Sequence, residues 1–370
     1  MRPRERLHGA QQMAFALALG SVIVACRGES PASVAPVPKV STPTTVVVPL
    51  RRLVQDRGLH VAVGTAVGSY FGRTDAAGAQ YAQVLAREFN ELTAENEMKF
   101  SSLRPSRAVF NFARPDSMVA FARANNMKVR GHTLAFGTQL SSWLTNGMWT
   151  AADVRALLDE HIIGTVTHYA GQLSAWDVVN EAFSENGTLK PTFWSNALGR
   201  AYIEQAFRSA AAADPAAALF YNDYNIETVG AKSDSVYEML RDFRARGVPV
   251  LGVGFQAHFI VGQTPTKDAL VSNMARFAAL GLKIQFTELD IRLTLPATAS
   301  TLATQATNYQ DVIRACLETP ACDMIVMWGF TDRSSWIPEA FPGMGAATLF
   351  DAGFLPKPAY SAVNDLLRLF

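Results

Sequence analysis

The sequence of 370 residues predicts an α/β fold, a single (β/α)8 TIM barrel, on two observations. Between residues 51 and 370, eight short apolar segments alternate with eight segments of helical periodicity. Polar residues follow the apolar segments, where a parallel barrel places its chemistry. Sequential parallel strands joined by helices close into such a barrel. The rival, a doubly wound open sheet, lacks support because no glycine-rich phosphate loop follows the first strand.

The elements are expected in strict alternation along the chain. The expected strands are 61–66, 89–93, 128–133, 174–179, 218–221, 251–255, 283–287 and 324–328. The expected helices are 81–87, 116–126, 151–169, 202–213, 233–246, 266–280, 301–317 and 359–369. Asp116 is expected to cap the second helix, and Pro215 to follow the end of the fourth.

The N-terminus is typical of an export signal. Three arginines within the first six residues precede an almost wholly apolar run at 13–25, which is too short to span a membrane. The run ends at Cys26, as in the lipobox of bacterial lipoproteins, where the cysteine is lipidated; the alternative is an ordinary signal peptide with a chance cysteine. We therefore expect a signal peptide at 1–25, a disordered tether rich in Pro, Ser and Thr at 26–50, and a catalytic domain at 51–370.

The two remaining cysteines, Cys316 and Cys322, flank a turn-like segment. An exported protein meets an oxidising compartment, so a small-loop disulfide is expected, with two buried free thiols as the alternative. A zinc site is not expected, because no histidine lies nearby at ligand spacing. The formal net charge of +1 gives no strong field for nucleic acid or other charged partners.

Two glutamates carry the functional prediction. Glu181 follows an apolar segment with Val178 and Val179, and Glu288 follows another more than 100 residues later. Two glutamates at converging strand ends are suited to paired-carboxylate catalysis. One strand-end glutamate alone would more often be a cap or a surface residue.

Further polar and aromatic residues are expected to gather at the same end of the barrel. They are Glu95, Asn96, Lys99, His132, Gln139, Asn180, Tyr221, Asn222, Gln256, His258, Asp290, Trp328 and Trp336. Each alone is more often structural, but their shared position at strand ends favours a functional set. Amide, histidine, lysine and tryptophan side chains suit sugars, because hydroxyls need planar hydrogen-bonding groups and pyranose faces stack on aromatic rings. The set does not resemble a phosphate or metal site.

Most of these residues fall in motifs that resemble those of glycoside hydrolase family 10, the retaining endo-1,4-β-xylanases. The motifs are TAENEMK at 93–99, RGHTL at 130–134, WDVVNE at 176–181, QAH at 256–258, TELD at 287–290 and WGFTD at 328–332. The resemblance runs from about residue 55 to the C-terminus. It implies endo-hydrolysis of xylan by double displacement, with Glu181 as the acid/base and Glu288 as the nucleophile.

The resemblance also implies supporting roles. Asn180 would contact the 2-hydroxyl of the sugar at the cleavage point, and His258, backed by Asp290, would orient Glu288. The remaining residues would contact or enclose the sugars: Glu95, Asn96, Lys99, His132, Gln139, Gln256, Tyr221, Trp328 and Trp336.

The sequence departs from the family pattern after RGHTL. Phe136 and Gly137 stand where the family usually has Trp and His, and Ser141 replaces a usual Pro. Gly137 removes a polar side chain near the carboxylates, and we expect a water or a neighbouring loop to fill the space.

The sequence is compatible with three functions: an exported xylanase, a retaining hydrolase of another β-glycan or glycoside, and a surface sugar-binding protein without catalytic activity. The intact glutamates disfavour the third. We expect no cofactor and no metal, a monomer whose partner is xylan or xylo-oligosaccharide, and a periplasmic or cell-surface location with membrane contact only through lipidated Cys26.

Overall fold

The computed structural model describes residues 47–370. The predicted signal peptide, Cys26 and the tether up to residue 46 lie outside the described residues. The folded unit begins at Val47, before the predicted domain boundary at residue 51. Leu50 is fully buried, and the carbonyl of Val48 accepts a hydrogen bond from Asn364. Residues 47–50 therefore belong to the barrel domain and not to the tether.

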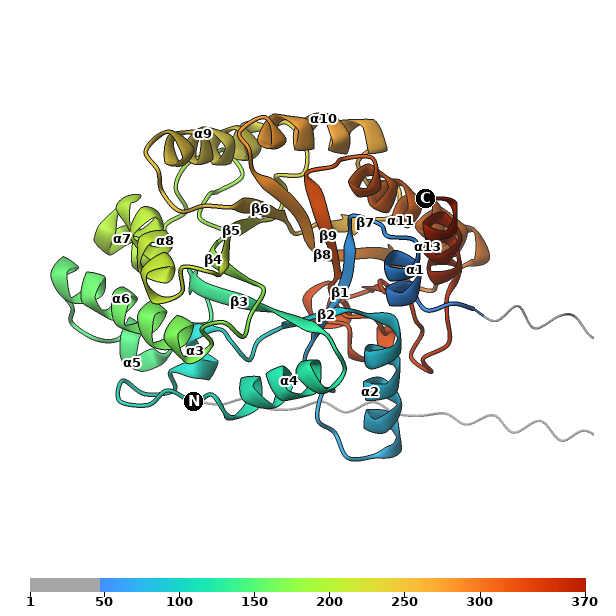
Figure 1. Ribbon diagram of the computed structural model, residues 1–370, viewed down its shortest axis with the longest axis horizontal. Coiled ribbons are helices and arrows are strands. Elements are labelled where there is room, and N and C mark those ends of the chain that lie inside the picture. Colours follow the sequence, from blue (N-terminus) through green and yellow to red (C-terminus); the bar gives the residue numbers. More distant parts are fainter. Residues whose placement is uncertain (1–46) are drawn as a thin grey trace, which may run out of the picture. The chain divides into compact units, whose positions relative to one another are not determined.

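Eight parallel strands form a closed barrel, as predicted (Figure 1). They are β1 (Ala62–Val67), β2 (Glu91–Ala94), β3 (Lys128–Phe136), β4 (Ala175–Asn180), β5 (Ala218–Asp223), β6 (Gly252–Phe255), β8 (Lys283–Thr294) and β9 (Cys322–Met327). The β1–β9 and β8–β9 pairings close the ring. Their burial on both faces explains why these strands are near-continuous apolar runs in the sequence.

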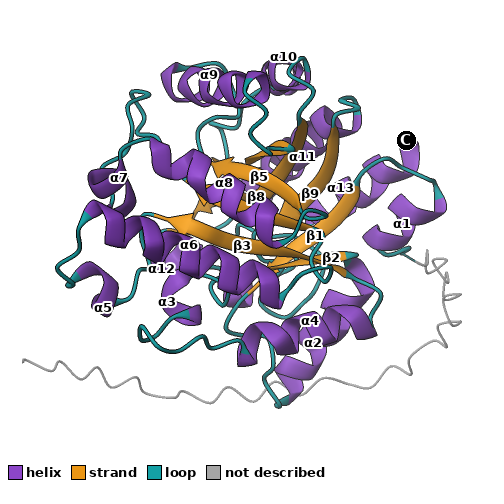
Figure 2. Ribbon diagram, turned by 60° about the vertical axis from the view of Figure 1, so that its left-hand side comes forward, coloured by secondary structure: helices purple, strands orange, loops and turns teal. Residues whose placement is uncertain are grey.

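Helices surround the barrel (Figures 1 and 2). They are α1 (Leu50–Asp56), α2 (Ala76–Glu88), α4 (Ala113–Ala124), α6 (Ala151–His168), α8 (Ala201–Ala213), α9 (Ala231–Ala245), α10 (Lys267–Ala278), α11 (Ala299–Leu317) and α13 (Pro358–Leu369). Short helices lie in the connecting segments: α3 (Phe100–Leu103), α5 (Ser142–Thr145), α7 (Phe193–Leu198), α12 (Ile337–Ala340) and the 3-10 turn Asp332–Ser334.

The start of α4 differs from the prediction. The helix begins at Ala113, so Asp116 lies inside the first turn and is not its cap. The Asp116 carboxylate instead accepts hydrogen bonds from His168 Nε2 at 2.9 Å and the Tyr169 hydroxyl at 3.0 Å. The Asp116 carboxylate, which the sequence predicted as a helix cap, therefore makes a tertiary contact with the end of α6 instead.

Strand β8 also differs, because it continues past its predicted end at Thr287 as far as Thr294. Two short strands pair with this extension: β7 (His258–Ile260) in parallel and β10 (Met344–Gly345) antiparallel. The extension carries β8 beyond the barrel rim. Side chains alternate along a strand, so Glu288, Asp290 and Arg292 share one face of β8.

Candidate active site

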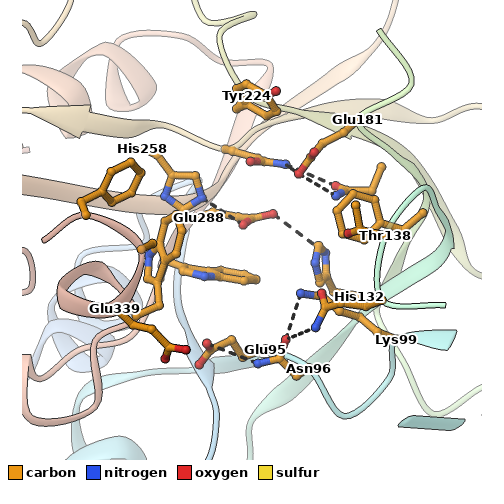
Figure 3. Close-up of a pocket in the computed structure, with 18 of the residues that line it drawn as sticks. Glu95, Asn96, Lys99, His132, Thr138, Glu181, Tyr224, His258, Glu288 and Glu339 are labelled. Carbon is orange, nitrogen blue, oxygen red and sulfur yellow. Dashed lines mark hydrogen bonds and ion pairs between the residues drawn. The ribbon is translucent and has the colours of Figure 1, made fainter. Parts of the chain in front are cut away.

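A cleft of about 830 Å³ lies at the C-terminal ends of the barrel strands (Figure 3). Most of the predicted site residues line it, although they come from seven strands and their following loops. The lining residues are Glu95, Asn96, Lys99, His132, Phe136, Thr138, Gln139, Asn180, Glu181, Tyr224, Asn225, Gln256, His258, Glu288, Arg292, Trp328, Trp336, Glu339, Ala340 and Phe341. The cleft is large enough for several sugar residues and mixes amide, charged and aromatic groups.

Glu288 is 5% exposed and is held by three neighbours. Its Oε1 accepts a hydrogen bond of 2.8 Å from Asn222 Nδ2 and lies 3.9 Å from His132 Nδ1. Its Oε2 lies 3.2 Å from His258 Nε2. Burial alone would raise the pKa of Glu288, but His132, His258 and Lys99 outweigh burial and lower it. Glu288 is therefore held as a carboxylate.

His258 is fixed between two carboxylates. Its Nδ1 lies 3.1 Å from Asp290 Oδ2, opposite the contact between Nε2 and Glu288. Burial disfavours the cation, yet Asp290 and Glu288 together raise the pKa of His258 to about 10. Asp290 also accepts a 2.8 Å hydrogen bond from Trp336 Nε1, which ties the indole to this triad. The pairing of β7 with β8, which sets His258 opposite Asp290, creates the arrangement.

His132 belongs to a second buried chain of charges. Its Nδ1 lies 3.0 Å from Asp177 Oδ2, and the Asp177 carboxylate is paired with the guanidinium of Arg130. All three side chains are at most 2% exposed. Burial opposes ionisation of Asp177, but Arg130 and His132 lower its pKa. The interior of the barrel thus supports the imidazole beside Glu288.

Glu181 stands directly after β4 with a backbone φ of +56°. A non-glycine residue in this left-handed region is uncommon and is held by its surroundings. The Glu181 N–H donates to the carbonyl of Asn222 at 2.9 Å, and the next N–H, of Ala182, donates to the Tyr221 hydroxyl at 3.0 Å. The Glu181 carboxylate accepts hydrogen bonds from Asn180 Nδ2 at 3.2 Å, from Gln256 Nε2 at 3.4 Å and from Lys190 Nζ at 3.1 Å.

Two amides connect the carboxylates of Glu181 and Glu288. Asn222 Nδ2 donates to Glu288 Oε1 and to Asn180 Oδ1, each at 2.8 Å. Asn180 in turn donates to Glu181. The side-chain oxygen of Asn222, Oδ1, accepts a hydrogen bond of 2.6 Å from the Thr287 hydroxyl. The relative positions of the two glutamates are therefore set by hydrogen bonds and not by packing alone.

One edge of the cleft carries the polar cluster predicted after β2. Asn96 Oδ1 accepts hydrogen bonds from Lys99 Nζ at 3.1 Å and from Gln139 Nε2 at 2.9 Å. Its amide nitrogen donates to Glu95 at 3.4 Å. Burial raises the pKa of Glu95 to about 7, with Lys99 opposing the rise. Burial also lowers the pKa of Lys99. These groups form a preorganised set of donors and acceptors for hydroxyls.

Aromatic walls complete the cleft. The Trp328 ring lies edge to face with His132, 5.3 Å between centroids, and the Trp336 ring lies 5.0 Å from His258 in the same manner. Phe136, at the position where the sequence departs from the family pattern, also lines the cleft, with Lys99 Nζ 5.8 Å from the centre of its ring. These rings offer apolar faces to a sugar.

The space beside Gly137 is filled by a neighbouring loop, as predicted. A Cβ at Gly137 would lie 2.4 Å from Thr192 Cγ2, so the Thr192 side chain occupies the place of the missing one. Thr192 caps α7, and Trp194 Nε1 donates to the Phe136 carbonyl at 2.8 Å. Ser141 donates to the Arg104 carbonyl at 2.6 Å. The loop before α7 therefore docks on the exit of β3.

Three predicted site residues, Asp290, Tyr221 and Asn222, lie behind the cleft surface. Asp290 is 1% exposed and acts through His258 and Trp336. Tyr221 is fully buried; its hydroxyl donates to Asp223 at 2.6 Å and supports the backbone after Glu181. Its neighbour Asn222 supplies the contact to Glu288. Adjacent side chains of a strand point to opposite faces, so Tyr221 and Asn222 are not expected to have the same role.

Several lining residues were not selected from the sequence: Thr138, Tyr224, Asn225, Arg292, Glu339, Ala340 and Phe341. Tyr224 and Asn225 follow β5 directly, so their position carried a usable signal. Lys190 lies nine residues beyond Glu181 in a loop, and no local pattern indicated its contact with that carboxylate.

The predicted disulfide is confirmed. Cys316 at the end of α11 and Cys322 at the start of β9 are bonded, with their Cα atoms 5.2 Å apart, and both are fully buried. Within residues 47–370 there is no cluster of three metal-ligating side chains. No helix in the same part of the chain is both long and apolar enough for a bilayer span.

The fold and the site together define a glycoside hydrolase that works through two carboxylates: a closed (β/α)8 barrel with a pair of glutamates in an amide- and aromatic-lined cleft at its C-terminal face. Comparison with known proteins makes the class specific. Residues 50–366 match the model of glycosyl hydrolase family 10, and the chain belongs to that family.

The chain is similar to relatives that are named as endo-1,4-beta-xylanases. Endo-1,4-beta-xylanase B of Thermotoga neapolitana is 41% identical over 322 residues, covering 87% of this chain and 92% of the relative. Endo-1,4-beta-xylanase A of Phanerodontia chrysosporium is 44% identical over 275 residues, covering 74% of this chain and 67% of the relative. The solved structure of xylanase 10B from Thermotoga petrophila RKU-1 in complex with xylobiose superposes with a TM-score of 0.84 at 41% identity, covering 87% of this chain and 98% of that one.

Proposed function

We propose that this protein is an endo-1,4-β-xylanase that cleaves internal bonds of xylan with retention of anomeric configuration. The observation that carries the proposal is the pair of glutamates. Glu288 is buried and its pKa is lowered by His132, His258 and Lys99, while Glu181 lies across the Asn180–Asn222 bridge. Membership in family 10 supports the retaining course, and the relatives named as xylanases favour xylan over other β-glycans.

In the first step Glu288 attacks the anomeric carbon of the bound sugar. The bond to the glycosidic oxygen breaks, and Glu181 gives that oxygen its proton, so the shortened chain leaves as an alcohol. A glycosyl ester on Glu288 remains. In the second step Glu181 takes a proton from water, whose oxygen attacks the same carbon and releases Glu288 as a carboxylate.

The supporting residues act on these two glutamates. His258 and Asp290 orient the Glu288 carboxylate, and the His132 imidazole, which is hydrogen-bonded to Asp177, lies 3.9 Å from it. Asn180 would contact the 2-hydroxyl of the sugar that is attacked, where hydrogen bonds strengthen as the oxocarbenium-like state forms. Gln256 Nε2 donates hydrogen bonds to Asn180 Oδ1 and to the Glu181 carboxylate, and so helps to hold both side chains in place.

The rest of the predicted set holds the sugar chain. Glu95, Asn96, Lys99 and Gln139 form the polar edge that would bind a neighbouring sugar on the non-reducing side. Trp328 and Trp336 would enclose the sugars next to the cut. Tyr221 supports the turn at Glu181.

We further propose that residues 1–25 direct export, that Cys26 carries a lipid anchor and that residues 26–46 link it to the barrel. The disulfide between Cys316 and Cys322 fits an oxidising, extracytoplasmic compartment. Metabolic labelling with a radioactive fatty acid tests the anchor: the wild-type chain should be labelled and the Cys26→Ser variant should not. If neither protein is labelled, the lipid anchor is refuted and the alternative, an ordinary signal peptide, is favoured.

The activity is tested by incubating the protein with linear xylan and with a β-1,4-glucan, separating the products by size. Short xylo-oligosaccharides from xylan and little product from glucan are expected. Glu288→Gln should abolish turnover while retaining oligosaccharide binding, and Glu238→Gln, at an exposed position on α9, is the matched control. A folded protein that is inactive on xylan would refute the proposal.

A further inference from the structure

One cation in the cleft, the guanidinium of Arg292, has no ion-pair or hydrogen-bond partner among the described residues. Lys190 pairs with Glu181, Lys99 is bonded to Asn96, and His258 lies between two carboxylates. Among residues 47–370, Arg292 forms no ion pair and its guanidinium donates no hydrogen bond to the protein; its Nε is buried without an acceptor. Burial lowers the pKa of Arg292, and Asp290 only partly offsets this. An arginine nevertheless remains charged, so this is a partly desolvated, unneutralised cation.

Arg292 is held in a defined orientation. Its guanidinium carbon lies 4.0 Å from the centre of the Phe341 ring, and both side chains line the cleft. The carbonyl of Arg292 accepts a 2.9 Å hydrogen bond from Val261, which follows β7. The stacked ring and the paired backbone restrict the side chain, so its planar set of donors is preorganised for a ligand.

The position along β8 says which part of a substrate would meet this cation. Arg292 and Glu288 share one face of the strand, and a strand rises about 3.3 Å per residue, so their Cα atoms are about 13 Å apart. That separation is larger than one sugar ring. A group bound by Arg292 therefore belongs to a neighbouring sugar or to a branch on it, and not to the sugar attacked by Glu288.

The chemistry of that group follows from the donor. A guanidinium presents parallel N–H groups that match a carboxylate, and a charge-assisted pair is stronger than a bond to a neutral hydroxyl. Glu339 also lines the cleft but makes no ion pair with Arg292, and its carboxylate is turned toward Glu95 (Figure 3). The anion that would neutralise Arg292 is thus not supplied by the described chain.

We propose that Arg292, stacked on Phe341, binds the carboxylate of a uronic-acid branch on the glycan, so that the enzyme prefers acidic xylan. The inference rests on the proposed xylanase function and assigns a specificity role to a residue outside the catalytic machinery. It requires that the same xylan be cleaved less efficiently when its carboxyl groups are absent.

The test compares one substrate in two forms. A xylan with uronic-acid branches is used as such and after chemical reduction of its carboxyls to alcohols, which leaves length and branching unchanged. The wild-type protein should show about fivefold higher kcat/KM on the acidic form at low salt, the size expected for one partly exposed charge-assisted contact. Added salt should diminish the ratio.

Arg292→Met should bring the ratio to about one by lowering kcat/KM on the acidic form only, and Arg292→Lys should retain part of the preference. Arg241→Met removes a positive charge on α9, outside the cleft, and should leave the ratio unchanged. Binding of acidic and reduced oligosaccharides to Glu288→Gln and to Glu288→Gln/Arg292→Met provides a second readout that does not need turnover.

The failures are distinguishable. If the wild-type protein cleaves neither form, the xylanase function itself is wrong. If it cleaves both forms equally, or if folded Arg292→Met loses activity on both forms equally, the carboxylate site is overturned and Arg292 only supports Phe341 and its loop.

Discussion

Replacing Gly137 by Ala should destabilise the protein through a single contact. The added Cβ would lie 2.4 Å from Thr192 Cγ2 and 3.0 Å from Thr192 Cβ. Thr192 cannot turn away freely, because its hydroxyl accepts the hydrogen bond that caps α7. The loop before α7 would have to move, and with it Lys190, which contacts Glu181.

The magnitude follows from the geometry. Separations below 3.0 Å require a shift of the backbone or of the loop, and overpacking of this kind costs about 1–3 kcal/mol. Thr192→Ser removes Cγ2 while keeping the capping hydroxyl, so it should cost about 1 kcal/mol or less in the Gly137 background. In the double variant the nearest atom would be Cβ at 3.0 Å, and most of the overpacking should disappear.

Urea unfolding of the wild-type protein, both single variants and the double variant gives the coupling free energy. We expect Gly137→Ala to lower the free energy of unfolding by about 2 kcal/mol, and Thr192→Ser to recover at least half of that loss. Equal destabilisation by Gly137→Ala in both backgrounds would refute the contact with Thr192 as the reason for glycine at this position.

Three further predictions concern charge and covalent structure. His258→Asn removes the cation, of pKa about 10, that lies beside Glu288, so the pKa of Glu288 should rise. The acid limb of the pH profile of kcat/KM should then move to higher pH by about one unit or more. An unmoved limb would contradict this. Burial raises the pKa of Glu91 to about 7. The contribution of Glu91 to the free energy of unfolding is therefore greatest below pH 4.5, where the carboxyl is protonated in both states, and falls by up to about 3 kcal/mol as the pH rises through 7. Urea unfolding at pH 5 and 8 should therefore show a smaller loss for Glu91→Gln than for the wild-type protein, and equal losses would count against the assignment. Replacing both Cys316 and Cys322 by Ala should lower the free energy of unfolding by about 2 kcal/mol, measured under conditions that leave the wild-type bridge oxidised; an unchanged midpoint would mean that the bridge constrains little.

The sequence predicted the barrel because its periodicities are strong and local. All eight barrel strands were expected, and all but β8 within a few residues of their bounds, since parallel strands buried on both faces leave continuous apolar runs. What local pattern could not give was contact across the molecule. The extension of β8 exists because β7 and β10 pair with it, and Asp116 is drawn away from a capping role by a partner, His168, that lies 52 residues further along the chain.

The site was predictable to a similar extent. Strand ends located the lining residues, since all eight strands present their C-terminal ends to one face. Tyr221 and Asn222 were both expected in the cleft, but neither lines it. Asn222 reaches Glu288 from behind and Tyr221 supports the backbone after Glu181, a division that local sequence does not reveal. Arg292 and Lys190 were missed because one lies on the unforeseen extension of β8 and the other on a loop whose path no periodicity records.

The most direct test of the central claim is covalent capture of the nucleophile. A 2-deoxy-2-fluoro xylobioside with a good leaving group should form a glycosyl ester that hydrolyses slowly, because the fluorine destabilises the oxocarbenium-like state. We expect a mass increase of one glycosyl group per chain, located by peptide mapping on Glu288 and absent from Glu288→Gln. An active protein that acquires no adduct, or acquires it on another carboxylate, would show that Glu288 is not the nucleophile.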